Sequence, residues 1–98
     1  MSSAEGFLTA YDGTQLHWDS FPATAPQRGV ILNICGLGDH SGLHPTITGT
    51  LPGQGFAVYA LDTRGNGKSG GKRGHVWRWA DFRDDLHRFV SLVRERET

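Results

Sequence analysis

Two glycine-rich segments contain the residues of this sequence whose types and spacing could do chemistry. The first spans residues 36–42 (GLGDHSG), and the second spans residues 62–74, where five of thirteen positions are Gly. Glycine lets the backbone approach a ligand closely and point N–H groups at it. The first segment is therefore either a cradle of backbone N–H groups for an anion or oxyanion, or a tight strand-to-helix turn that binds no ligand.

The second segment resembles the end of a phosphate-binding P-loop at Gly67, Lys68 and Ser69. That motif needs a Gly five positions before the Gly-Lys pair. This sequence has Asp62 there, whose carboxylate would repel phosphates, and further glycines follow where a helix should begin. A small nucleotide-binding module that uses Gly67, Lys68 and Ser69 stays open as an alternative.

Residues 67–71 (GKSGG) also match the G-x-S-x-G pattern of a nucleophile elbow, with Ser69 at its centre. An elbow needs a strand that runs directly into the motif, whereas the strand predicted here ends at Leu61. We therefore predict that Ser69 forms hydrogen bonds within its loop and is not a nucleophile.

Histidines offer a third kind of chemistry. His40 and His44 stand four positions apart, near Cys35 and Asp39, and on a helix that spacing could bind a metal. A single thiol and helix-breaking glycines argue against such a site, so we expect neither a metal nor a cofactor. His17 has no visible set of partners in the sequence.

The elements that must position these segments follow from hydrophobic patterning. Residues 30–34 and 56–61 are nearly all apolar, as expected of strands buried on both faces of a parallel sheet. A glycine-rich segment follows each of them, and in open α/β sheets ligands bind at the carboxyl ends of the strands. Between these strands, residues 44–51 predict a short or irregular helix, because Gly49 and Pro52 interrupt it.

The two ends of the chain complete the pattern. Residues 7–11 and 15–21 alternate on either side of an Asp-Gly pair, which predicts a β-hairpin. Residues 80–96 predict an amphipathic helix whose apolar stripe consists of Phe82, Leu86, Phe89, Val90 and Val93. The order is typical of an α/β fold: a β-hairpin, then parallel strands with a crossover helix, then a helix.

Composition narrows the classes of protein. The 98 residues fit one small domain, and 10 Lys and Arg balance 10 Asp and Glu, which argues against a nucleic-acid partner. A single cysteine excludes an internal disulfide framework. No apolar run is long enough to span a membrane, and the first residues show no signal peptide. We therefore expect a cytoplasmic protein without a transmembrane segment.

With both segments in this order, the chain resembles the N-terminal part of an α/β-hydrolase. The nearest group is that of the monoacylglycerol lipases and lysophospholipases, the serine-aminopeptidase-like hydrolases. The resemblance runs from about Gly6 to the last helix. The matching positions are residues 36–42, 55–62, Arg64, Gly65, Gly67, residues 69–71, Arg73, Gly74, Asp81, Phe82, Asp84 and Asp85.

The resemblance implies roles in the first segment. The backbone N–H of Leu37 would donate to the oxyanion that forms during acyl transfer. Asp39, His40 and Ser41 would contribute to substrate binding along the acyl pocket. The family usually has His where this chain has Cys35, so a side-chain hydrogen bond that braces the segment is missing.

The second segment is a structural signature in this resemblance. It comprises Asp62, Arg64, Gly65, Gly67 and Ser69, of which the first two would tie it to the first segment. The substrate implied is a small-molecule carboxylic ester or lipid, cleaved through an acyl-enzyme.

The resemblance also implies that residues 1–98 are the N-terminal segment of one incomplete hydrolase domain. In this family the nucleophilic Ser, the acid and the His follow in that order after the helix of residues 81–96. We therefore expect all three beyond Thr98, and the 98-residue chain alone to be inactive. A non-catalytic truncated remnant, or a chain that associates with a second one supplying the triad, stays an alternative.

One strand is exposed in this arrangement. In the family's strand order, residues 30–34 pair with residues 56–61 on one side and with a later strand, expected beyond Thr98, on the other. Without that later strand, we expect the most apolar strand to be an open edge that promotes self-association.

Overall fold

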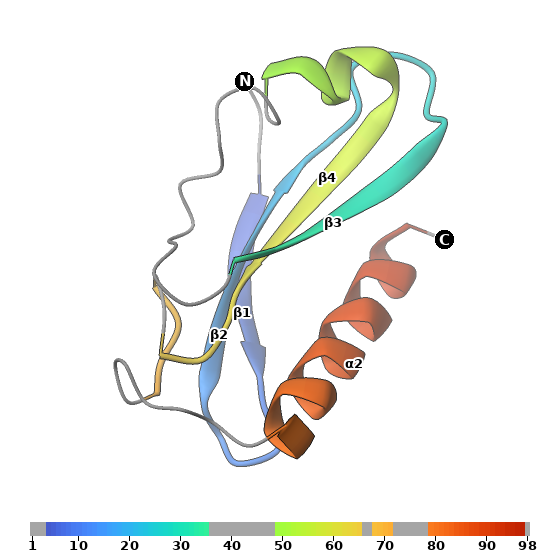
Figure 1. Cartoon of the computed structure of the whole chain (residues 1–98). Coiled ribbons are helices and arrows are strands. Elements are labelled where there is room, and N and C mark those ends of the chain that lie inside the picture. The colour runs from blue at the N-terminus through green and yellow to red at the C-terminus, as the bar shows by residue number, and fades with distance from the viewer. Residues whose placement is uncertain (1–3, 36–48, 66–67, 72–78, 98) are drawn as a thin grey trace.

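A single mixed sheet and one long helix make up most of the molecule (Figure 1). The computed structural model describes residues 4–35, 49–65, 68–71 and 79–97. The sheet has four strands in the order β1-β2-β4-β3. The elements are β1 (Ala4–Thr9), β2 (Gln15–Phe21), β3 (Gly29–Cys35), the 3-10 helix η1 (Pro52–Gln54), β4 (Phe56–Asp62) and α2 (Trp79–Arg96).

The predicted hairpin is confirmed. Strand β1 pairs antiparallel with β2 from Ala4 opposite Ser20 to Thr9 opposite Gln15. The N–H of Ala10 donates to the carbonyl of Thr14 across the turn, at 2.8 Å. Gly13 adopts φ +88°, a left-handed conformation that favours glycine. The turn sets the register that places every β1 side chain on one face or the other.

The predicted parallel pair is confirmed as well. Strands β3 and β4 run parallel from Gly29 opposite Phe56 to Cys35 opposite Asp62. On its other side β4 pairs antiparallel with β2, so β4 is central, and all its residues after Phe56 are buried.

Strand β3 differs from the prediction in its burial. It lies at the edge of the described sheet, and its residues from Gly29 to Ile34 are half-buried or exposed, with Leu32 at 37% exposure. The apolar run predicted burial on both faces, but the strand has one neighbour among the described residues. Within the described sheet, β3 is therefore an edge strand, as expected.

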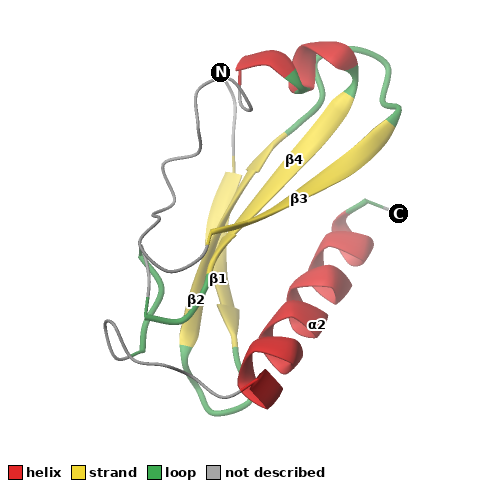
Figure 2. Cartoon of the chain, viewed as in Figure 1, coloured by secondary structure: helices red, strands yellow, loops and turns green. Residues whose placement is uncertain are grey.

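Helix α2 lies along one face of the sheet (Figure 2). It begins at Trp79, one residue before the predicted start. Phe89 and Val93 of the predicted stripe are buried in the core, where they join Leu16, Trp18, Tyr59 and Leu61. Leu86 of the stripe is half-buried and packs against this core, and Val90 is half-buried. Asp85, which the stripe did not include, is also buried, and it binds an arginine of the second glycine-rich segment.

The interrupted helix before β4 ends as the sequence predicts. Residues 49–50 are helical and lead to η1, while 44–48 lie outside the described residues. Gly55 stops the turn at φ +95° and donates its N–H to the carbonyl of Pro52 at 3.1 Å.

Within the described residues, no helix is both long and apolar enough to cross a membrane.

Candidate functional site

The carboxyl ends of β3 and β4 lie side by side, at the end of the sheet where both parallel strands finish. Cys35, the last residue of β3, is opposite Asp62, the last residue of β4. Both glycine-rich segments leave the sheet from this point, since one begins at residue 36 and the other at residue 62. This is the edge at which open α/β sheets bind ligands.

Asp62 is buried at the start of the second segment. Its Oδ2 accepts the backbone N–H of Lys68 at 3.1 Å and lies 3.3 Å from Nδ1 of His17. Its other oxygen, Oδ1, has no hydrogen-bond partner among the described residues. The carboxylate therefore closes the loop onto the end of β4 and also faces β2.

Ser69 fixes the far side of the same loop. Its hydroxyl donates to the carbonyl of Asp62 and accepts the backbone N–H of His17 at 2.7 Å. The side chain is 1% exposed. Gly70 adds a backbone bond to the carbonyl of Gln15 at 2.7 Å. A hydroxyl held in this way is not available as an exposed nucleophile.

The same contacts do not favour the nucleotide-binding alternative. A P-loop cradles phosphates with free backbone N–H groups and a Ser or Thr hydroxyl. Here the N–H of Lys68 and the hydroxyl of Ser69 are already bound to Asp62. A buried carboxylate thus lies where phosphate would have to bind.

Gly65 holds the beginning of the loop. Its N–H donates to the carbonyl of Gly70 at 2.7 Å, and it adopts φ +80°. A residue with a Cβ would be strained in this left-handed conformation. The second segment therefore closes on itself by a backbone bond between two glycines.

Arg64 joins the second segment to two other elements. It donates from Nε and Nη2 to the two carboxylate oxygens of Asp85 on α2, each at 2.8 Å. It also donates from Nη1 to Oδ2 of Asp12, in the hairpin turn, at 2.7 Å. The hydrogen bonds to Asp85 raise the pKa of Arg64 above its ordinary value against the effect of burial. The bonds from Arg64 hold the pKa of Asp12 well below its usual range.

The first segment lies outside the described residues. Leu37, Asp39, His40 and Ser41 belong to it, so their roles remain predictions. The predicted tie between the two segments is untested for the same reason. The partners described for Asp62 and Arg64 lie instead on β2, the hairpin turn and α2. Gly67 also lies outside the described residues.

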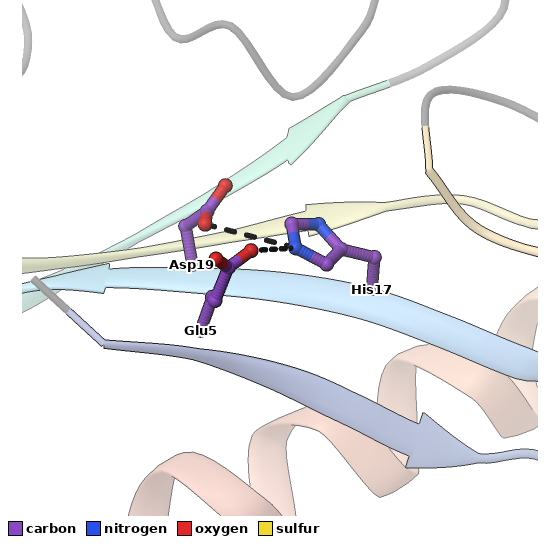
Figure 3. Close-up of side chains that lie close together, drawn as sticks. All are labelled: Glu5, His17 and Asp19. Carbon is purple, nitrogen blue, oxygen red and sulfur yellow. Dashed lines mark hydrogen bonds and ion pairs between the residues drawn. The ribbon is translucent and has the colours of Figure 1, made fainter.

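His17 is a residue that the sequence analysis missed. It is 1% exposed, and its Nε2 lies 2.7 Å from Oε1 of Glu5 and 3.8 Å from Oδ1 of Asp19 (Figure 3). The hydrogen bond from His17 is the main cause that lowers the pKa of Glu5, and burial raises the pKa of Asp19. The hairpin register was the available signal, because it places Glu5 opposite Asp19 and next to His17.

Solved structures with this arrangement are hydrolases of the α/β fold. A carboxyl esterase from Bacillus coagulans matches with a TM-score of 0.79 and 21% identity over 98% of this chain and 33% of that one. A soluble variant of monoglyceride lipase from Saccharomyces cerevisiae matches with a TM-score of 0.78 and 23% identity over 93% of this chain and 31% of that one. The predicted fold class, an N-terminal part of an α/β-hydrolase sheet, is confirmed.

The sequence comparisons give the family. Residues 25–98 match the model of the family described as serine aminopeptidase, S33. A monoacylglycerol lipase from Mycolicibacterium smegmatis is 32% identical over 90 residues, which are 92% of this chain and 32% of that protein. The chain belongs to the serine aminopeptidase S33 family of α/β hydrolases. It spans about a third of the length of each of these three proteins.

Proposed function

We propose that this chain is the N-terminal scaffold of a serine hydrolase that cleaves carboxylic esters of the monoacylglycerol or lysophospholipid class. Its chemical contribution is the backbone N–H of Leu37, which donates to the oxyanion of the tetrahedral intermediate. One observation carries the proposal: the parallel register sets Cys35 opposite Asp62, so the first segment leaves the sheet beside a firmly held loop.

The physical need is a donor that does not move during the reaction. Acyl transfer places negative charge on the carbonyl oxygen, and a fixed N–H stabilises that charge by about 2.7–4 kcal/mol per donor. Buried β4 and the contacts of Arg64 and Ser69 fix the described part of the second segment next to the strand end from which the first segment continues. In this proposal Asp39, His40 and Ser41 line the substrate pocket next to the donor.

The nucleophile, its base and the acid are not assigned to the described residues. Ser69 is buried and bonded, so it does not attack the ester. In this proposal the triad belongs to sequence outside these 98 residues, and the serine hydroxyl attacks the acyl carbonyl and forms an acyl-enzyme that water hydrolyses.

The lipid class of the substrate is supported by the Mycolicibacterium smegmatis relative named monoacylglycerol lipase. We also propose that the enzyme acts in the cytoplasm.

The test uses the protein extended downstream of Thr98 as its gene encodes it. Leu37→Pro removes the N–H donor, whereas Leu37→Ala keeps it and serves as the matched control. We expect Leu37→Pro to lower kcat for a monoacylglycerol by about 10²–10³-fold and Leu37→Ala to change it little. Thermal melts of both variants check that the loop change leaves the fold intact.

Two results would contradict the proposal. One is a folded Leu37→Pro enzyme with kcat close to that of the parent. The other is a downstream sequence with no strand and G-x-S-x-G motif, together with no labelling by a fluorophosphonate probe. That second result would favour the non-catalytic remnant.

A further inference from the structure

Three potential metal ligands gather on the face of the β1–β2 hairpin that contains His17. Glu5, His17 and Asp19 each offer one ligand atom, and these atoms lie within 4.8 Å of one another. Figure 3 shows the two carboxylates pointing toward the imidazole from neighbouring strands. We call these residues the hairpin cluster. One imidazole nitrogen and two carboxylate oxygens form a ligand set that zinc accepts in proteins.

Among the described residues, the hairpin cluster brings two carboxylates together with little compensation from side-chain cations. Glu5 and Asp19 are directly opposite each other in the register, and like charges in that position destabilise a sheet. Asp62 brings a third carboxylate to His17 from β4. The ammonium of Lys68 lies 3.9 Å from Glu5, but its side chain is 63% exposed and water screens it. A divalent cation at this position would neutralise the two facing carboxylates.

The two nitrogens of His17 support the same conclusion. Nδ1 is buried, has no hydrogen-bond partner in the described structure and lies 3.3 Å from Oδ2 of Asp62. A neutral imidazole carries one ring proton. In the structure Nε2 donates a hydrogen bond to Glu5, at 2.7 Å. An ion bound to Nε2 would replace this hydrogen bond and leave the single ring proton on Nδ1, facing Asp62. A carboxylate behind the second nitrogen of a histidine is the arrangement that orients metal-binding histidines.

The two distances from His17 lie near those of a tetrahedral ion, and the oxygens of Glu5 and Asp19 are within 4.8 Å of each other. Bonds of about 2.0–2.1 Å to zinc place ligand atoms roughly 3.3 Å apart. The Nε2 of His17 lies 2.7 Å from Glu5 and 3.8 Å from Asp19, on either side of that value. Glu5 is 62% exposed on an outer strand and is free to shift, whereas His17 is held by its contacts. The open side at Glu5 leaves the fourth position for water.

We propose that Glu5, His17 and Asp19 bind a zinc-class divalent cation, with Asp62 orienting His17 from behind. The ion would link β1 to the sheet at the strand that supports the second glycine-rich segment. This inference does not depend on the proposed esterase activity, because every ligand lies in the described hairpin.

The test is calorimetric titration of the chelator-treated full chain with zinc sulfate, with the thermal midpoint as a second readout. We expect one equivalent to bind and to raise the midpoint. Glu5→Gln and Asp19→Asn should each weaken binding at least tenfold, and Asp62→Asn by about 10–100-fold. Substitution of the buried His17 could prevent folding. Glu5 is exposed, so Glu5→Gln keeps the test valid in that case.

Two matched controls separate this cluster from other ligands. His87→Gln changes an exposed histidine on α2 and should leave zinc affinity unchanged. Cys35→Ala with His40→Gln removes ligands of the first segment and should also leave it unchanged. The proposal would be overturned if the parent chain did not bind zinc, or if Glu5→Gln and Asp19→Asn bound it with parent-like affinity. In either case the contact between His17 and Glu5 would be an ion pair without a metal. Loss of binding in the Cys35→Ala, His40→Gln chain alone would overturn it too.

Discussion

Arg64 shows how one side chain can hold several parts of this fold. Its guanidinium makes two bonds to Asp85 on α2 and two to Asp12 in the hairpin turn. Asp85 is buried, so its charge is compensated chiefly by this contact. Removing one partner of a buried ion pair is costly, because the remaining charge stays away from water.

We therefore expect Arg64→Met to lower the free energy of unfolding by about 3 kcal/mol. Arg88→Met is the matched control, since Arg88 binds Asp84 at 2.8 Å on the exposed side of the same helix. Such an exposed pair contributes less than about 0.5 kcal/mol. Urea unfolding followed by circular dichroism measures both variants. Equal losses in the two variants would show that the burial of Asp85 has no energetic consequence.

Asp12 gives the same network a pH dependence. Hydrogen bonds from Arg64 lower its pKa in the folded state, so the unfolded state takes up the proton first as the pH falls. The stabilisation is complete above the ordinary value near 3.8 and is lost as the pH drops toward the folded pKa. We expect Asp12→Asn to flatten the decline of unfolding free energy below pH 4. A decline as steep as that of the parent chain would contradict this assignment.

At the scale of elements, the turn before β4 depends on one glycine. Gly55 has φ +95°, and a Cβ there would lie 2.5 Å from the carbonyl oxygen of Pro26. We expect Gly55→Ala to destabilise the chain by about 1–3 kcal/mol or more. Gly49→Ala, where nothing lies within 4 Å, should change stability by less than about 1 kcal/mol. Thermal melts of the two variants measure this difference in stability. A Gly55→Ala chain as stable as the Gly49→Ala chain would contradict backbone strain at position 55.

The elements and the burial of β4 could be predicted from the sequence, but the burial of His17 and Asp85 could not. The period-2 pattern, the Asp-Gly turn and the apolar runs carry local information, and they gave the hairpin and the parallel pair. The burial of His17 depends on Ser69, which is 52 positions away, and that of Asp85 depends on Arg64. In β2, His17 points to the opposite face from Leu16 and Trp18, because successive side chains of a strand alternate between the two faces. The loop that covers this face is a long-range feature that no short pattern reports.

At the scale of the whole molecule, β3 is the element that we expect to govern how the chain behaves in solution. Within the described sheet it has one neighbouring strand, and its Leu32 side chain is exposed, so it offers a template for a second chain. We expect the 98-residue chain to self-associate at micromolar concentration in sedimentation velocity, and Leu32→Lys to shift it toward monomer. Phe7→Lys is the matched control, because Phe7 is exposed on β1 at the opposite edge and its replacement should leave association unchanged. A monomeric parent chain with a cooperative melt would show that the β3 edge is not the liability that its exposure indicates.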